Sequence, residues 1–228
     1  MIDGTRGLTM DTLSRSSLDT VRTLADLVGP FIEQVAARRI EVYNEFSLQH
    51  ELGIFLRDIF PQDRVQFERN VKDFFPDKLS SFTKREIDIS VFSADKKQLK
   101  WAIELKFPRN GQHPEQMFSF CKDIAFAEQL RAAGFSQTGL LIFADDDLFW
   151  RGPTDGIYGF FRGGSPLQGS VRKPTGAKDI EIRICGSYTV KWEVISDGMK
   201  FAAIEVVSTT GLALEPYKSI GSMSPYVA

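Results

Sequence analysis

Two short stretches decide the fold expected for this chain: Arg85-Glu86-Ile87-Asp88-Ile89-Ser90-Val91 and Trp101-Ala102-Ile103-Glu104-Leu105-Lys106-Phe107. In each stretch, apolar residues alternate with mostly polar ones, which is the pattern of a β-strand with one apolar face. Turn-compatible polar residues fill the gap between the stretches, so we expect an antiparallel hairpin. The hairpin would bring Asp88 close to Glu104, and the alternation places Lys106 on the same face as Glu104.

Two carboxylates and one ammonium group on one surface suit the hydrolysis of a phosphodiester. Carboxylate oxygens are ligands for Mg²⁺, and a bound Mg²⁺ polarises the phosphoryl oxygen and helps to generate hydroxide at neutral pH. Lys106 would orient the attacking water or offset the charge that grows on the phosphate in the transition state. This chemistry needs neither histidine nor cysteine, and His50 and His113 each lack a partner at metal-ligand spacing.

The two stretches resemble the site of the PD-(D/E)XK nuclease superfamily, over a window that runs from Asn44 to Phe149. The resemblance implies an α/β (α+β) restriction-endonuclease-like fold, with a central mixed sheet flanked by helices. It implies a metal site formed by Asp88, Glu104 and the backbone carbonyl of Leu105, with Lys106 as the catalytic lysine. Mg²⁺, or Mn²⁺ in its place, would be the cofactor, and the substrate would be nucleic acid, with DNA preferred because most members cut DNA.

Other residues are alternatives or additions to this site. Many members of the superfamily carry a glutamate on the helix before the first core strand, and Glu51 is the first candidate for it, ahead of Glu45 and Asn44. Asp77 follows a proline, as the family's aspartate often does, but it lies in an expected loop, whereas Asp88 lies in an alternating strand. Asp95 has the family's spacing to Lys97 and falls in the expected turn, so we discount it.

Apolar spacing predicts helices on both sides of the strands. In an N-terminal segment, residues 1–44, one helix would run to Val28, where Gly29-Pro30 interrupts it, and a second would follow from Phe31 to Ile40. The core, residues 45–150, would continue with a helix, a first strand, the hairpin, a second helix and a buried strand. Besides the hairpin, the core elements have these expected bounds: Phe46 to Phe60, Val65 to Val71, Pro114 to Gly134 and Thr138 to Ala144.

Residues 151–228 form the last part of the expected domain. Arg151 to Lys178 reads as a long Gly/Pro-rich loop in which Arg151 and Arg162 surround aromatic residues, a composition that suits contacts to a nucleic-acid backbone and bases, although the aromatics would also pack on the core. Gln116, at the start of its helix, is a candidate polar helper. A C-terminal antiparallel β extension follows as a three-stranded meander over residues 180–207, and residues 211–228 show no periodicity.

Composition sets further bounds. A chain of 228 residues with 43% hydrophobic content can bury a core as one domain. It contains no apolar run near the ~18 to 20 residues of a membrane span, and its first residues lack an apolar signal core, so we expect a cytoplasmic protein. Cys121 and Cys185 do not suggest a disulfide framework, and Cys121 is expected to be a buried thiol. Asp145, Asp146 and Asp147 are expected to form a solvated turn.

Three functional readings remain. The first is a Mg²⁺-dependent DNA endonuclease that acts alone, as a homodimer or with an accessory subunit. The second is a catalytically inactive nuclease-fold module that binds nucleic acid or a protein, and an ion pair that holds Lys106 away from any open cleft would favour it. The net charge of −2 argues against strong nonspecific nucleic-acid binding. The third is a purely structural charge ladder across neighbouring strands.

Overall fold

The computed structural model describes residues 23–109, 111–176, 180–196 and 198–206. Its centre is a six-stranded sheet with the strand order β1-β2-β3-β4-β8-β7. The strands of this sheet are β1 (Asp63–Asn70), β2 (Glu86–Ser93), β3 (Leu99–Lys106), β4 (Gln137–Ala144), β7 (Glu193–Ser196) and β8 (Met199–Val206). Only β3 and β4 pair in parallel, and the other neighbours pair antiparallel, so the sheet is mixed.

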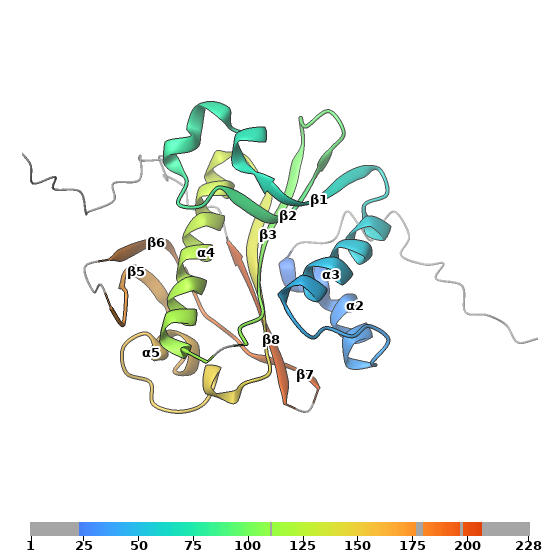
Figure 1. The fold of residues 1–228 in the computed structure, drawn as a ribbon. Coiled ribbons are helices and arrows are strands. Elements are labelled where there is room, and N and C mark those ends of the chain that lie inside the picture. Colours follow the sequence, from blue (N-terminus) through green and yellow to red (C-terminus); the bar gives the residue numbers. More distant parts are fainter. Residues whose placement is uncertain (1–22, 110, 177–179, 197, 207–228) are drawn as a thin grey trace, which may run out of the picture.

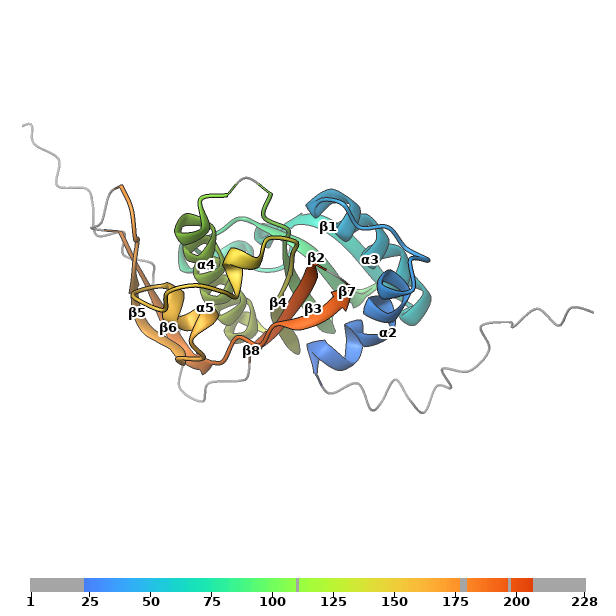
Figure 2. The same ribbon diagram turned by 90° about the horizontal axis from the view of Figure 1, so that it is seen from below.

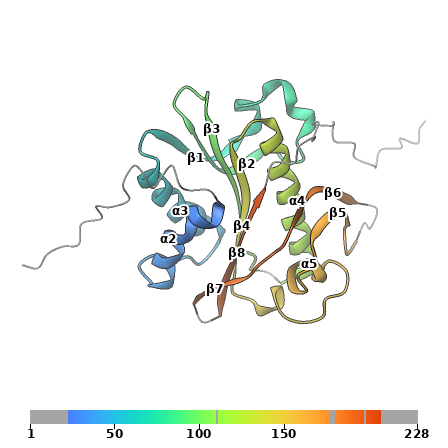
Figure 3. The same ribbon diagram turned by 180° about the vertical axis from the view of Figure 1, so that it is seen from behind.

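Helices cover both faces of the sheet (Figure 1). α2 (Leu24–Ala36) and α3 (Glu45–Ile59) lie on one face, and α4 (His113–Ala133) lies on the other, as the view from below and the view from behind also show (Figures 2 and 3). α5 (Tyr158–Arg162) and a two-stranded sheet of β5 (Leu167–Arg172) and β6 (Glu181–Tyr188) lie beyond α4. The expected mixed sheet flanked by helices is therefore confirmed.

The expected order of the core elements is also confirmed: α3, then β1, β2 and β3, then α4 and β4. β2 and β3 form the antiparallel hairpin, and α4 crosses over the sheet to connect β3 to the parallel strand β4. Residues Thr138 to Ala144 are all buried, as expected for a strand covered on both faces. Because β3 and β4 are parallel, their carboxyl ends lie side by side at one edge of the sheet.

The prediction of two N-terminal helices was wrong within the described residues. α2 is one helix that contains Gly29 and Pro30, although proline removes a backbone donor from a helix interior. The helix starts at a capping box in which Thr23 and Asp26 satisfy each other's backbone groups. Its buried stripe runs through the proline at helical spacing, at Leu24, Leu27, Val28, Phe31, Ile32 and Val35. Packing of this continuous stripe on the sheet outweighs the local cost of the proline.

The three-stranded meander was also a wrong prediction. β7 and β8 form a hairpin in the main sheet, but β6 pairs with β5, which lies inside the segment expected to be a loop. Trp192, whose alternation suggested a strand, instead donates from Nε1 to the carbonyl of Phe161 at 2.9 Å and packs at 5.6 Å from the ring of Trp150. Trp192 therefore lies outside any strand, and its side chain anchors α5.

Two contacts fix the layers on each side of the sheet. Gly53 lies in the middle of α3, and a Cβ there would overlap the ring of Phe67 on β1, so the glycine lets the strand ring lie against the helix. On the other side, the buried carboxylate of Glu128 on α4 accepts hydrogen bonds from the N–H groups of Cys185 and Gly186 and from the Tyr188 hydroxyl. These bonds attach β6 to α4.

Candidate active site

The pairing of β2 with β3 ends at the Ile89–Ile103 pair, and two carboxylates continue the connection between the strands. Asp88 Oδ2 accepts a hydrogen bond from the Leu105 N–H at 2.7 Å. In return, Glu104 Oε1 accepts one from the Asp88 N–H at 3.4 Å. Side-chain oxygens thus stand where backbone carbonyls would stand in a continuing ladder. The expectation that the hairpin brings Asp88 close to Glu104 is confirmed.

Glu104 is fully buried, and a lysine outside the two strands neutralises it. The Lys84 ammonium group, from the segment just before β2, donates to Glu104 Oε2 and also to Asp123 Oδ1 at 2.8 Å. Asp123 is itself buried in α4. Burial raises the pKa of Glu104 well above its ordinary value, and the neighbouring charge of Asp88 raises it further. Burial alone would lower the pKa of Lys84, but the charges of Glu104, Asp123 and Asp88 outweigh it and raise that pKa.

Lys106 is held by carboxylates from two helices. Its Nζ lies 3.5 Å from Glu45 Oε1 on α3 and 3.5 Å from Asp123 Oδ2 on α4, and it donates to the Leu105 carbonyl at 2.9 Å. Glu45 also accepts from the Phe107 N–H at 2.9 Å, which fixes the start of α3 against the end of β3. Although burial opposes it, the pKa of Lys106 is raised, because Asp123, Glu45 and Asp88 surround the ammonium group. Lys106 therefore stays charged.

A small pocket of about 60 Å³ opens beside Asp88. It is lined by Glu45, Phe46, Gln49, Glu68, Asp88 and Leu105. Gln49 Nε2 donates both to Glu68 Oε1 at 2.7 Å and to the Asp88 carbonyl at 2.9 Å, so the amide holds the two strands of the pocket wall together. Glu68 has a φ of 49°, which is the left-handed region that a glutamate in a strand rarely adopts.

Burial raises the pKa of Asp88 to about 6, and the charges of Lys84 and Lys106 and the Leu105 N–H oppose that rise. The carboxylate therefore titrates just below neutral pH, unlike a solvated aspartate. Its second oxygen, Oδ1, accepts no hydrogen bond from the described residues. Asp88 thus lines the pocket with a carboxylate of which one oxygen has no protein donor among the described residues.

The oxygens of Asp88, Glu104 and the Leu105 carbonyl are of the kind that a hard divalent cation binds, but the Lys84 ammonium group already binds one of them. Asp88 Oδ1 is free, and Mg²⁺ typically uses one or two carboxylates and keeps several waters. In the described part of the chain, however, no three His, Cys, Asp or Glu side chains are grouped so that they hold a metal as they stand. Glu104 is engaged by Lys84, and the Leu105 carbonyl is engaged by Lys106. A cation shared by Asp88 and Glu104 would have to take the place of the Lys84 ammonium group.

The helical glutamate beside Lys106 is Glu45, which the sequence analysis ranked below Glu51. Glu51 lies further along α3, is half-buried and has no side-chain hydrogen bond or ion pair to another described residue. Asn44 is the N-cap of α3 and accepts from the Ser47 N–H at 2.8 Å. Asp77 is exposed in a 3₁₀ turn, and Asp95 lies in the β2–β3 turn, where it accepts from Ser93 and Lys97.

The candidate substrate residues lie apart from the pocket. Gln116 is half-buried in the first turn of α4. Arg151 is exposed, pairs with Asp147 at 3.2 Å, and lines a separate cleft of about 760 Å³. Arg162 donates from Nε to the Leu148 carbonyl at 2.9 Å and lies 3.8 Å over the Tyr158 ring, so its guanidinium group holds the local chain together.

The three residues of the acidic run after β4 each contact a basic side chain, so the run is not simply solvated. Asp145 pairs with Arg109, Asp146 with His113 at 2.7 Å, and Asp147 with Arg151. His113 is the first residue of α4, and its contact with Asp146 joins that helix to the segment after β4. Cys121, by contrast, is buried as expected.

Sequence reasoning missed Lys84, Asp123, Gln49 and Glu68. Asp123 carried a signal, because it lies three residues after Phe120 and four before Ala127 and so falls on the apolar stripe of its helix. A charged residue on a buried stripe needs a partner. Lys84 and Gln49 carried none, since their contacts join segments far apart in the sequence.

No protein-family model matches the sequence, and no curated protein or solved structure matches the chain either. Among the described residues, no helix is both long and apolar enough to cross a membrane.

Proposed function

We propose that this protein is a metal-dependent nuclease of the PD-(D/E)XK type that cuts DNA as an endonuclease. The observation that carries the proposal is the meeting of Asp88, Glu104 and Lys106 at the end of the β2–β3 pairing, with Asp88 facing a pocket. Three charged side chains at that position, two of them with raised carboxyl pKa values, are more typical of a reaction site than of a surface charge ladder.

Each residue has a separate task in this proposal. Asp88, Glu104 and the Leu105 carbonyl would hold Mg²⁺ or Mn²⁺, which supplies a polarised phosphate and a water of lowered pKa. Lys106 carries the positive charge beside the Leu105 carbonyl, and Glu45 and Asp123 keep its ammonium group in position. A fixed cation of this kind offsets the negative charge that grows on the phosphate during the reaction.

A second candidate function is an inactive module of the same fold that binds nucleic acid or a protein. One observation favours it: Lys106 is ion-paired to Glu45 and Asp123 and does not line the pocket beside Asp88. The Lys84 ammonium group likewise occupies Glu104. In a module without activity, these pairs would simply neutralise buried charges.

Cleavage of circular and linear DNA with Mg²⁺ or Mn²⁺ separates the two candidates. The wild type should cut, and Asp88→Asn and Lys106→Ala should each lower the rate by at least about 100-fold, as loss of a group that stabilises transition-state charge does. Asn at position 88 keeps an oxygen that accepts from the Leu105 N–H, so the fold should survive. Asp155→Asn and Lys97→Ala, at exposed positions, are the matched controls.

Metal binding measured by calorimetry completes the test. The wild type should bind Mn²⁺, and Asp88→Asn should bind it more weakly. If the wild type neither cuts DNA nor binds the metal, the inactive module becomes the better proposal. If the wild type does cut both strands of DNA, a homodimer is expected. Gel filtration with and without DNA would test for it.

A further inference from the structure

We propose that Phe46 is a base-stacking residue of the substrate site, and that the bound nucleic acid has unpaired nucleotides beside the phosphate to be cut. This inference rests on the nuclease function proposed above and names the class of DNA that it would use.

The Phe46 side chain is exposed to solvent, although most aromatic side chains of the described residues are buried or half-buried. Phe46 is 81% exposed, the most exposed large apolar side chain among the described residues. It is the second residue of α3, on the side away from the buried stripe of Leu48, Leu52 and Leu56. No ring or cation of the described residues stacks on it. An exposed ring of this size, held on a rigid helix, has its contact surface available to a ligand.

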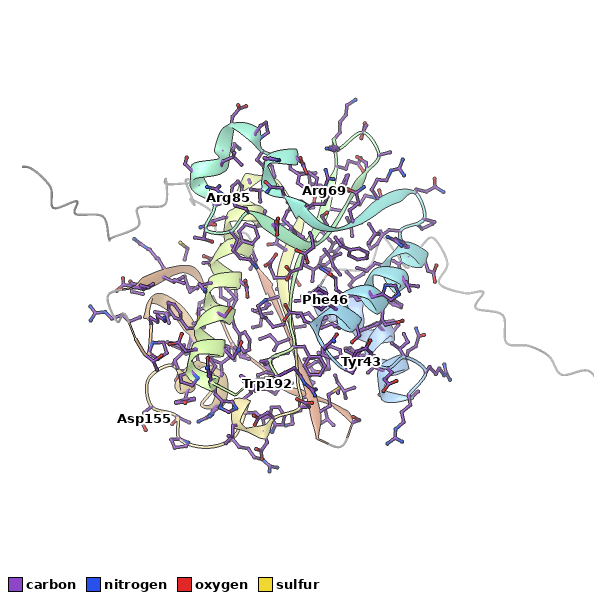
Figure 4. All side chains as sticks on the ribbon, in the orientation of Figure 1. Tyr43, Phe46, Arg69, Arg85, Asp155 and Trp192 are labelled. Carbon is purple, nitrogen blue, oxygen red and sulfur yellow. The ribbon has the colours of Figure 1, made fainter. Side chains whose placement is uncertain are left out.

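The ring also lies at the right place. Phe46 lines the same pocket as Asp88, together with Glu45 and Glu68. Tyr43, three residues earlier and just before α3, is 60% exposed, and Figure 4 shows the two aromatic side chains near each other at that end of the helix. A base that stacked on Phe46 would therefore bring its own phosphates towards the pocket that Asp88 also lines.

Charge points to stacking as the source of affinity. The side chains that line the pocket include three carboxylates and no lysine or arginine, and the whole chain has a net charge of −2. A protein of this charge gains little from phosphate contacts alone. Stacking on an aromatic ring does not depend on basic residues and tolerates any base. Bases inside a duplex are already stacked on both faces, so one ring binds an unpaired base best.

Fluorescence anisotropy with a labelled oligothymidine in EDTA, where no cutting occurs, tests the inference. Phe46→Ala should weaken binding by about 5- to 150-fold, the range found for loss of one stacked base. Phe46→Trp should retain binding, and Phe46→Leu should lose it, because leucine is apolar but offers no π-face. Ile54→Ala, an exposed apolar position on the same helix, is the control. The factor lost should be the same at low and high salt, since stacking releases no counterions.

The outcomes separate this inference from the nuclease proposal. Metal-dependent cutting that Phe46→Ala leaves unchanged, or binding that Phe46→Leu retains, overturns the stacking role. Binding of a blunt duplex as tight as that of the single strand overturns the preference for unpaired nucleotides. Binding that depends on Phe46, without cutting in Mg²⁺ or Mn²⁺, supports the stacking role and overturns the nuclease function. Absence of DNA binding by the wild type in EDTA, together with absence of cutting in Mg²⁺ or Mn²⁺, overturns both.

Discussion

Replacing Lys84 by methionine is the perturbation whose effect follows most directly from the structure. The Lys84 ammonium group neutralises Glu104, which is fully buried, and Asp123, whose side chain is 3% exposed. Methionine keeps an unbranched apolar stem of similar length near the Phe126 ring but removes the charge. Glu104 would then retain only the Asp88 N–H at 3.4 Å. Removal of one partner of a buried ion pair typically costs about 3 to 5 kcal/mol.

Protonation limits this cost and makes it depend on pH. Once Lys84 is gone, the pKa of Glu104 in the folded protein rises further above its unfolded value. The folded state then binds a proton that the unfolded state releases, so the stability of the variant falls as pH rises. Taking the unfolded pKa as about 4.3, protonating Glu104 costs at most about 3.7 kcal/mol at pH 7 and about 1 kcal/mol at pH 5. Because the pKa of Glu104 is already raised in the wild type, these costs are upper limits: we expect Lys84→Met to lose up to about 3 kcal/mol at pH 7 and up to about 1 kcal/mol at pH 5.

Urea unfolding at the two pH values, followed by circular dichroism, measures these losses. Lys97→Met is the matched control, because Lys97 is 83% exposed and water screens its pairing with Asp95 at 3.6 Å. Adding Glu104→Gln to Lys84→Met should recover part of the loss, since the uncompensated charge disappears. The reasoning is refuted if Lys84→Met loses the same free energy at both pH values or no more than Lys97→Met at pH 7.

Two further predictions concern packing and thiol reactivity. Gly53→Ala should destabilise the protein by about 1 to 3 kcal/mol, because the new methyl group meets the Phe67 ring. In thermal unfolding, adding Phe67→Leu should restore part of this loss. A Gly53→Ala variant as stable as wild type would contradict the overlap. Iodoacetamide at pH 8 should alkylate Cys185, which is exposed, and spare Cys121, because burial raises the pKa of the Cys121 thiol to about 12. Mass spectrometry should find both thiols labelled in urea. Equal labelling of the two thiols in the native protein would contradict the burial of Cys121.

The sequence predicted what depends on neighbouring residues. Alternation placed β2 and β3, and the turn between them made a hairpin, so the approach of Asp88 to Glu104 followed from local rules. The order of the core elements along the chain followed likewise. These elements follow from the spacing of apolar residues, which can be read within a short window of the sequence.

What the sequence did not predict depends on how distant elements meet. Glu45 and Glu51 are both on α3, and the choice between them depends on where the end of β3 meets the helix, which brings Glu45 to the Phe107 N–H. Pro30 suggested a break because its local cost is visible in the sequence, whereas the packing that overrides it is not. Lys84 joins Glu104 and Asp123 across 20 and 39 positions of the chain, without a periodic pattern.

The exchange of hydrogen bonds between Asp88 and β3 has a consequence for how such sites change over evolutionary time. The Asp88 carboxylate accepts a hydrogen bond from the Leu105 N–H as a main-chain carbonyl would, and the Glu104 carboxylate accepts one from the Asp88 N–H. A descendant that lost all chemistry would still unpair the buried Leu105 N–H if it discarded Asp88, at about 1 to 3 kcal/mol, and would also unpair the N–H of position 88, which is half-buried, if it discarded Glu104. Selection for a folded chain alone would thus retain both acids long after any reaction had ceased. In proteins built this way, an intact pair of acids records the architecture and does not by itself show that the reaction is still under selection.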